Sequence, residues 1–282
     1  MRPSDIIRGL AALTLTLGLT GAAALAEAPR RVVSVNLCTD QLAMMLAAPG
    51  QLVSVSKVAR DPYSSAMAEE AAGMPVNSGR AEEVFALRPD LVLAVSWTDP
   101  YLLSTLTRLG VRVEVFDLVQ TLDDIPALVT RLGAVLGRED AATARAAEFQ
   151  RDLTALRSAA RTPRSAVFYY PNGYTLGAGT LSDEILQAAG FRNLAGDLGY
   201  SAGGVMPLEE LVQAKPDLVI TAPAYAGASR AEEIMQHPVL RRVTEDAATV
   251  ESGAEWGCGT PLVIEAIRRM AAVHDALPEA RP

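Results

Sequence analysis

Residues 81–94 read AEEVFALRPDLVLA and residues 208–221 read LEELVQAKPDLVIT, so one pattern occurs twice at an offset of 127 positions. In each copy, acidic residues open a helical stretch, Pro89 or Pro216 stops it, and an apolar run follows. Acidic side chains suit the positive end of a helix, and the residue before a proline is biased away from helix. Short apolar runs rich in branched residues are typical of buried parallel strands. Each copy therefore predicts a helix followed by a parallel strand, and the two copies together indicate a duplication.

Strand and helix signals alternate around both copies of this block. Around the first copy we expect strands at 31–36, 51–56 and 111–116, and helices at 39–47 and 99–110. Around the second copy we expect strands at 165–170 and 248–252, and helices at 181–190, around 230–237 and at 261–277. The alternation predicts an α/β fold, with two Rossmann-like lobes whose parallel sheets are covered by helices on both faces.

The segment 121–161 separates the two halves and has no strand signal. It is rich in helix formers, with Leu and Ala at helical spacing, whereas a flexible linker would be rich in Gly, Ser or Pro. We expect a long bridging helix here, with Gly137 as the place for a break, between an N-terminal α/β lobe at 27–120 and a C-terminal α/β lobe at 162–282. A surface helical hairpin within one sheet is the alternative interpretation.

The first 26 residues have the pattern of a signal peptide. Arg2 and Arg8 give a positive start, an apolar stretch follows at 10–19, and a small-x-small site ends at Ala26. We expect cleavage after Ala26 and export to the periplasm; a retained membrane anchor is the alternative. No later segment has the length of uninterrupted apolar sequence that a membrane span needs, so no stable membrane insertion is expected.

Composition excludes several classes of function. With 25 basic and 33 acidic residues the formal charge is −8, which gives nucleic acid no broad basic surface to bind. His237 and His274 are the only histidines, and neither has a second ligand at metal-binding spacing. The sequence also lacks the nucleotide-binding, zinc-protease and serine-hydrolase motifs. We expect no catalytic residues, no metal site and no resident cofactor.

Ligands of doubly wound sheets bind beyond the carboxyl ends of the strands. The residues that follow the expected strands include both tryptophans and several tyrosines of a chain that is only 5% aromatic. This concentration predicts a wide cleft for a large ligand with apolar faces, although loop aromatics can also cover a core. Arginines there would select anionic groups, unless they are merely solvated. The candidate ligand-binding residues are Thr39, Arg60, Tyr63, Arg80, Trp97, Tyr170, Tyr225 and Trp256, together with two cysteines.

Cys38 follows the first strand of the first lobe, and Cys258 follows the last strand of the second lobe. An exported protein with two cysteines is a candidate for a disulfide, which here would staple the lobes across the mouth of the cleft. Free thiols that line the cleft and thiolates that bind a metal or metal cofactor are the other interpretations. The sequence leaves all three open.

The whole of the chain beyond residue 26 resembles the helical-backbone periplasmic binding proteins of ABC importers for cobalamin, ferric siderophores and haem. The features that carry the resemblance are RVVSVNLCTDQLAMMLA at 31–47, both copies of the repeated block, and the helical bridge. The resemblance implies a monomeric receptor that captures a bulky metal chelate between two lobes. It also implies delivery to an inner-membrane permease with its ATPase. The sequence does not distinguish a ferric siderophore from cobalamin or haem.

In that family each lobe presents an acidic residue to arginines of the permease. By match to the repeated block, the resemblance assigns this docking role to Glu82 and Glu209, with Glu83 and Glu210 as equally repeated neighbours. A plain role at the start of a helix is the alternative for these acids. The competing functions are a two-lobed Rossmann-like enzyme, either a transferase or a Cys-dependent hydrolase, and the binding lobe of a sensor.

Overall fold

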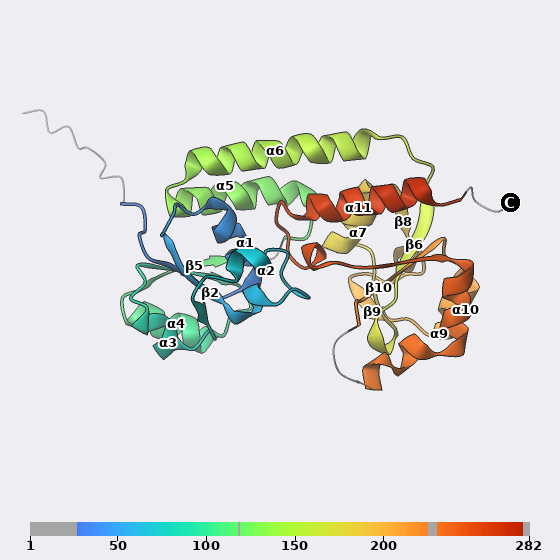
Figure 1. Cartoon of the computed structure of the whole chain (residues 1–282), viewed down its shortest axis with the longest axis horizontal. Helices are drawn as coiled ribbons and strands as arrows, with labels where there is room; N and C mark the ends of the chain where they lie inside the picture. The colour runs from blue at the N-terminus through green and yellow to red at the C-terminus, as the bar shows by residue number, and fades with distance from the viewer. Residues whose placement is uncertain (1–26, 118, 225–229, 279–282) are drawn as a thin grey trace, which may run out of the picture.

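The computed structural model describes residues 27–117, 119–224 and 230–278. Parallel strands form a five-stranded sheet in the first lobe, in the order β3-β2-β1-β4-β5 (Figure 1). The strands are β1 (Val32–Ser34), β2 (Leu52–Ser56), β3 (Val76–Asn77), β4 (Leu91–Val95) and β5 (Arg112–Phe116). The helices are α1 (Leu37–Leu46), α2 (Ala68–Ala71), α3 (Ala81–Ala86) and α4 (Pro100–Arg108), with a 3-10 turn η1 (Lys57–Arg60).

The second lobe has a four-stranded parallel sheet in the order β11-β10-β6-β8. Its strands are β6 (Arg164–Phe168), β8 (Phe191–Asn193), β10 (Leu218–Thr221) and β11 (Ala248–Glu251), and β7 (Tyr174–Leu176) and β9 (Gly203–Val205) form a separate antiparallel pair. The helices are α7 (Leu181–Ala188), α8 (Leu194–Asp197), α9 (Leu208–Ala214), α10 (Pro238–Asp246) and α11 (Val263–Ala276), with 3-10 turns η3 (Pro171–Gly173), η4 (Arg230–Gln236) and η5 (Ala254–Trp256).

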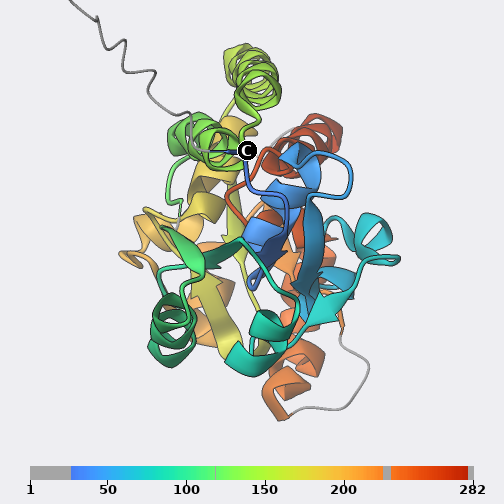
Figure 2. The ribbon, with the colours of Figure 1, turned by 90° about the vertical axis from the view of Figure 1, so that its left-hand side faces the viewer.

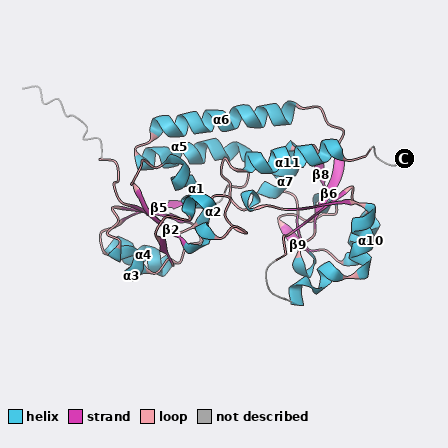
Figure 3. Ribbon diagram, in the orientation of Figure 1, coloured by secondary structure: helices cyan, strands magenta, loops and turns pink. Residues whose placement is uncertain are grey.

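The two sheets have the same connectivity. The order β2-β1-β4-β5 in the first lobe matches β8-β6-β10-β11 in the second, and β4 and β10 are the strands of the repeated block. Helices flank each sheet (Figure 3). The α/β fold with two Rossmann-like lobes, expected from the alternation of elements, is therefore confirmed.

An aspartate of the repeated block performs the same task in both lobes. Asp90 accepts a hydrogen bond of 2.9 Å from the backbone N–H of Arg31, next to the start of β1. Asp217 accepts one of 2.7 Å from the backbone N–H of Ser165 in β6. Since β4 pairs with β1 and β10 pairs with β6, each carboxylate fixes the start of its strand to the neighbouring strand.

The helix of each copy ends on a basic residue with a left-handed backbone. Arg88 has a φ of 51° and Lys215 has a φ of 47°. This conformation is unfavourable for residues with a Cβ and turns the chain from the helix into the following Pro-Asp pair. The repeat is therefore preserved in backbone geometry as well as in sequence.

Local capping sets where several helices begin. The side chain of Asn36 accepts a hydrogen bond from the N–H of Cys38, so α1 starts two residues earlier than expected. Asp99 caps α4, which has Pro100 in its first turn, and Thr180 caps α7. The helix expected around 230–237 is present as the 3-10 helix η4 (Arg230–Gln236), and α10 follows it.

The segment 121–161 contains two helices where one long bridging helix was expected. The 3-10 turn η2 (Leu122–Asp124) leads into α5 (Ile125–Leu136), Gly137 ends α5 with a φ of 67°, and α6 (Glu139–Ser158) returns along it. A Cβ on Gly133 would lie 2.2 Å from Cβ of Ala142, so α5 and α6 are in close contact. The bridge to the second lobe is α6, and α5 packs on α1 of the first lobe (Figure 1).

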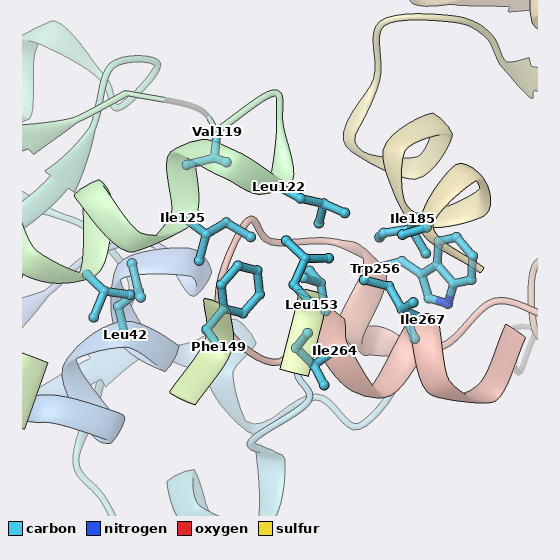
Figure 4. Packing of buried hydrophobic residues seen from close by; sticks show 14 of the residues in the cluster. Leu42, Val119, Leu122, Ile125, Phe149, Leu153, Ile185, Trp256, Ile264 and Ile267 are labelled. Atoms are coloured by element: carbon cyan, nitrogen blue, oxygen red, sulfur yellow. The ribbon is translucent and has the colours of Figure 1, made fainter. Parts of the chain in front are cut away.

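One hydrophobic core runs through both lobes beneath this pair of helices. It includes Leu42 of α1, Phe149 and Leu153 of α6, Ile185 of α7 and Ile267 of α11 (Figure 4). Helices α5, α6 and α11 lie together on one side of the molecule in both perpendicular views (Figure 2). The lobes are thus packed against a common helical layer.

Alternate residues of the strands face different cores. Val32 of β1 belongs to the shared core, whereas Val33 faces a separate cluster with α3 and α4. In the second lobe Phe168 belongs to the shared core and Val167 to the cluster beside α9. The period of two along each strand therefore divides the inner faces of the sheets from the outer ones.

The expected signal peptide, residues 1–26, lies outside the described residues. Among the described helices, none combines the length and the hydropathy that crossing a membrane would require.

Candidate functional site

Cys38 and Cys258 form a disulfide that links the two lobes. The bond joins the first turn of α1 to the loop after η5, with a Cα–Cα distance of 5.3 Å and a sequence separation of 220 residues. Cys258 is buried and Cys38 is half-buried. Of the three interpretations of the cysteines that the sequence left open, the structure shows the disulfide.

A second contact lies beside this bond. A Cβ built on Gly259 would lie 2.5 Å from Cβ of Val119, which precedes the α5–α6 pair. Such a distance leaves no room for any side chain, so glycine is required at this crossing. We call the loop 256–260, with its bond to Cys38 and its contact with Val119, the clasp.

Thr39 and Asp40 lie inside the first lobe. Thr39 is 1% exposed, and its Oγ1 donates to the carbonyl of Asn36 at 2.9 Å and lies 2.7 Å from Oγ of Ser34. Because α1 begins before these residues, its first turn directs them toward the sheet. Thr39 therefore has no surface to offer a ligand, contrary to the sequence-based expectation.

Asp40 is fully buried and joins α1 to the end of β2. Its carboxylate accepts a hydrogen bond of 3.0 Å from the backbone N–H of Ser56 and another from the Ser56 hydroxyl. Burial raises the pKa of Asp40 to about 6, against hydrogen bonds from Ser34 and Ser56 that act in the opposite direction. The buried position between α1 and β2 therefore favours the protonated form of this carboxyl.

Arg60 and Tyr63 follow β2. The guanidinium of Arg60 donates to the carbonyl of Ala71 at 3.2 Å and to that of Met74, so it holds the turn around α2. The ring of Tyr63 is 46% exposed. Of this pair, Tyr63 presents apolar surface to solvent, whereas the cation of Arg60 is engaged within its own lobe.

Arg80 and Trp97 remain at the surface of the first lobe. The Arg80 side chain is 77% exposed at the start of α3, with its Nε 3.8 Å from the carboxylate of Glu83. Trp97 follows β4 and is 53% exposed. Both residues lie at the carboxyl edge of the sheet, as expected, and retain the surface needed to contact another molecule.

In the second lobe Tyr170 follows β6 and is partly buried. Its hydroxyl donates to Oγ of Ser252 at 3.1 Å, just after β11, and its ring centroid lies 5.9 Å from that of Phe168. Burial raises the pKa of Tyr170. The hydroxyl therefore stays protonated and links the carboxyl ends of two strands.

Trp256 is a core residue. It is 7% exposed and lies near Ile185 and Ile267 (Figure 4). Its ring meets that of Phe168 edge to face at 5.5 Å. Its indole N–H has no hydrogen-bond acceptor in the part of the chain that the structure describes. The expectation that Trp256 faces a ligand is replaced by a packing role in the shared core. Tyr225, another expected ligand residue, lies outside the described residues.

The β7–β9 pair adds surface residues that the sequence did not suggest. Tyr174 and Val205 are cross-strand partners and are 44% and 64% exposed. The carbonyl of Tyr174 accepts the N–H of Tyr170 at 2.8 Å, so these residues border the end of β6. Alternation in the triplet YTL directly after the Pro-Asn-Gly turn was the available signal for this strand.

The two glutamates of each repeated pair have different surroundings. Glu83 accepts hydrogen bonds from the N–H of Ser78 at 3.0 Å and from its hydroxyl, and these bonds, led by that from the hydroxyl, lower its pKa. Glu210 accepts a 2.6 Å hydrogen bond from Tyr200, which raises the pKa of that tyrosine to about 12. Glu83 and Glu210, the second glutamate of each pair, are thus hydrogen-bonded within their own lobes.

Glu82 and Glu209 are exposed, and within the described part of the chain their carboxylates make no hydrogen bond or ion pair. They open α3 and α9, which lie on the side of the molecule away from α6 (Figure 1). The structure therefore distinguishes the members of each pair, and it does so in the same way in both lobes.

Two surface pockets lie apart from these residues. One, of about 610 Å³, is bordered by α7, β8 and the end of α6. The other, of about 1170 Å³, lies at the amino ends of β6, β10 and β11. Neither is lined by a predicted ligand residue, and among the described residues no group of three or more His, Cys, Asp or Glu side chains is arranged to hold a metal ion.

Comparison with known proteins identifies relatives over most of the chain. The family model described as periplasmic binding protein matches residues 32–248, which include the first sheet, the α5–α6 pair and the second lobe as far as the start of β11. A cobalamin-binding protein of Halobacterium salinarum is 29% identical over 199 residues, or 68% of this chain and 54% of that protein. A vitamin B12-binding protein of Pectobacterium carotovorum is also 29% identical over 199 residues, or 70% of its length. The chain thus spans about half of the length of the Halobacterium salinarum relative.

Solved structures share the fold at lower identity. The periplasmic heme-binding protein RhuT from Roseiflexus sp. RS-1 superposes with a TM-score of 0.73 at 20% identity, covering 88% of this chain and 99% of that one. The vitamin B12-binding protein BtuF of Vibrio cholerae gives a TM-score of 0.67 at 18% identity, with 89% and 99% covered. These structures support the two-lobed architecture.

Proposed function

This chain belongs to the periplasmic binding protein family, and we propose that it is the solute receptor of an ABC importer. The observation that carries the proposal is the extent of the family match, which includes the first lobe, the α5–α6 pair and the second lobe as far as the start of β11. Family membership implies a periplasmic location. The family and the similar structures are binding proteins, so the chain is a binding protein and not the two-lobed enzyme considered as the alternative.

We infer that the ligand is a bulky metal chelate, and specifically a corrinoid. The relatives that are 29% identical in sequence are named for cobalamin and vitamin B12, which favours a corrinoid over haem or a ferric siderophore. Exposed rings at the carboxyl edges of both sheets supply apolar surface for such a ligand: Tyr63 and Trp97 in one lobe and Tyr174 in the other. Arg80 supplies a cation for anionic groups of the ligand.

Binding in this arrangement requires little movement of the lobes. The clasp and the shared core join the two lobes, so little closure of the lobes around the ligand is needed and binding loses little free energy to such a movement. Glu82 and Glu209 then present one unpaired carboxylate per lobe to cationic groups of a permease built from two matching halves. Engagement of both carboxylates would pull on the lobes and release the ligand.

Ligand binding is tested by calorimetric titration of the protein, from residue 27 onward, with cyanocobalamin, hemin and a ferric hydroxamate siderophore. We expect saturable binding of cyanocobalamin and a weaker or absent response to the other two. The double variant Tyr63→Ala/Trp97→Ala should bind at least tenfold more weakly, since a buried aromatic contact contributes about 1–3 kcal/mol. The matched control is Tyr101→Ala, an exposed tyrosine of α4 outside the assigned set. Absence of binding to all three ligands would overturn the proposal.

Docking is tested in cells that depend on this protein for uptake of the chelate. The charge reversal Glu82→Lys/Glu209→Lys should abolish uptake and leave the affinity for the ligand unchanged. Glu139→Lys/Asp140→Lys on α6 makes the same change in net charge on the opposite side of the molecule and should leave uptake intact. Normal uptake by the first variant would refute the assignment of the docking acids.

A further inference from the structure

Each helix that carries an unpaired docking acid also exposes an apolar side chain one turn later. Phe85 follows Glu82 on α3 and is 43% exposed. Val212 follows Glu209 on α9 and is 39% exposed. Residues three apart in a helix lie on the same face, so each lobe presents a carboxylate and an apolar side chain side by side.

The exposure of Phe85 departs from that of the other phenylalanines. The protein has five phenylalanines, and the other four, Phe116, Phe149, Phe168 and Phe191, are each 2% exposed or less. Leaving a large ring in water forfeits the stabilisation that its burial would give. A single exposed ring beside an unpaired carboxylate is therefore a candidate contact for another protein.

The second lobe repeats this arrangement at the same offset. Phe85 and Val212 occupy one position of the repeated block, and the residues just before them, Val84 and Leu211, are fully buried in both lobes. The period of the helix consequently directs position 85 and position 212 outward. Both helices lie on the side of the molecule away from α6 (Figure 1).

We propose that these two acid–apolar pairs, Glu82 with Phe85 and Glu209 with Val212, form a bipartite docking surface for the two halves of the permease. The occupant is defined by charge complementarity and repetition: a twofold membrane protein that offers, in each half, an arginine or lysine next to an apolar pocket. This inference rests on the proposed receptor function. It adds that apolar burial at Phe85 and Val212 contributes to docking together with the salt bridges.

The two contributions differ in their dependence on salt. An interaction of Glu82 or Glu209 with a cation weakens as ionic strength rises, whereas burial of Phe85 or Val212 does not. Loss of an acid therefore flattens the salt dependence of docking, and loss of an apolar side chain leaves the slope unchanged. If Phe85 took no part in docking, its loss would change neither the affinity nor its salt dependence, so the lowered affinity at an unchanged slope distinguishes the docking role.

The test measures the affinity of the protein for the reconstituted permease–ATPase complex that imports the chelate, in nanodiscs, at 50 and 300 mM salt. From the exposed fractions, we expect Phe85→Ser to weaken docking roughly fivefold and Val212→Ser roughly threefold at both salt concentrations. Phe85→Leu should retain most of the affinity. Leu109→Ser, at a residue 49% exposed at the end of α4, is the matched control and should have no effect.

Three results would contradict the inference. If Phe85→Ser and Val212→Ser dock within twofold of the unaltered protein while Glu82→Lys/Glu209→Lys does not dock, the surface is electrostatic only and the inference is wrong. If Leu109→Ser weakens docking equally, the effect is not specific to these pairs. If the unaltered protein itself does not bind the complex, the receptor function fails, and the inference fails with it. Thermal unfolding and ligand titration of each variant confirm that fold and ligand site are intact.

Discussion

Removal of the disulfide should destabilise the whole protein strongly. The bond between Cys38 and Cys258 spans 220 residues, which is most of the length of the chain between residues 27 and 278. In the chain-entropy description a bond over a loop of this length restricts the unfolded chain by about 5 kcal/mol, and losses of native disulfides are typically about 2–5 kcal/mol. We expect Cys38→Ser/Cys258→Ser to lower the free energy of unfolding by about 3–5 kcal/mol, which lowers Tm by roughly 10 °C for a protein of this size.

The assay is urea unfolding at pH 7, followed by the fluorescence of the buried Trp256. A Trp97→Phe background removes the exposed tryptophan, so the signal comes from the shared core alone. Oxidised protein, the same protein with reductant, and the double serine variant are compared. Reduced protein and the serine variant should unfold at the same urea concentration, and reductant should have no effect on the serine variant.

A loss of stability below about 1 kcal/mol would refute the reasoning. It would mean that α1 and the loop 256–260 stay close in the unfolded chain, so that the bond restricts little. Quantification of free thiols in the unfolded oxidised protein checks independently that the bond is formed.

Three further predictions concern Asp40, the clasp and the left-handed end of α9. The pKa of Asp40 is about 6 in the folded protein and 3.8 ordinarily, so its contribution to stability is fully present below pH 3.8 and is lost as pH rises through 6. The expected change in the free energy of unfolding is about 3 kcal/mol. Urea unfolding between pH 3.5 and 7.5 measures this change, and Asp40→Asn should remove that part of the pH dependence. Gly259→Ala places a methyl group against Val119 and should lower the free energy of unfolding by about 1–3 kcal/mol. The double variant Gly259→Ala/Val119→Ala should recover part of this loss. Equal stability of the single and the double variant would contradict the close approach of Gly259 to Val119. Lys215 has a left-handed backbone with a φ of 47°, and Lys215→Gly removes the steric cost of that conformation. The free energy of unfolding should rise by about 0.5–1 kcal/mol, with a slightly higher Tm. A lower Tm would show that the lysine side chain stabilises the turn.

Local sequence patterns predicted the repeated block closely because its signals are local. The acids, the proline and the apolar run at 81–94 correspond to α3 and β4, and the second copy corresponds to α9 and β10. Each element is defined by the residues within it, so no knowledge of the rest of the fold was needed. The same holds for the helical character of 121–161 and for its break at Gly137, although the return of α6 along α5 depends on packing between the two helices.

Side-chain direction was predicted less well, because it depends on partners far away in sequence. Asn36 starts α1 two residues early, and this rotates Thr39 into the lobe. Trp256 follows a strand, as a ligand residue would, but its ring packs against Phe168 of another strand. The choice between Glu82 and its neighbour likewise depends on Ser78, which lies outside the repeated block. No pattern within the repeat contains that information.

The core shared by the two lobes limits which fragments of such a protein can fold on their own. Leu42 belongs to one lobe and Ile267 to the other, and both pack with Phe149 in a single cluster. A fragment that ends before α11 would leave this cluster open to water, so neither half is a self-sufficient module despite the evidence for duplication. A chimera that joins the first lobe of this chain to the second lobe of a relative would therefore need matched side chains along α6 as well. The unit that recombination can exchange intact is the whole two-lobed body.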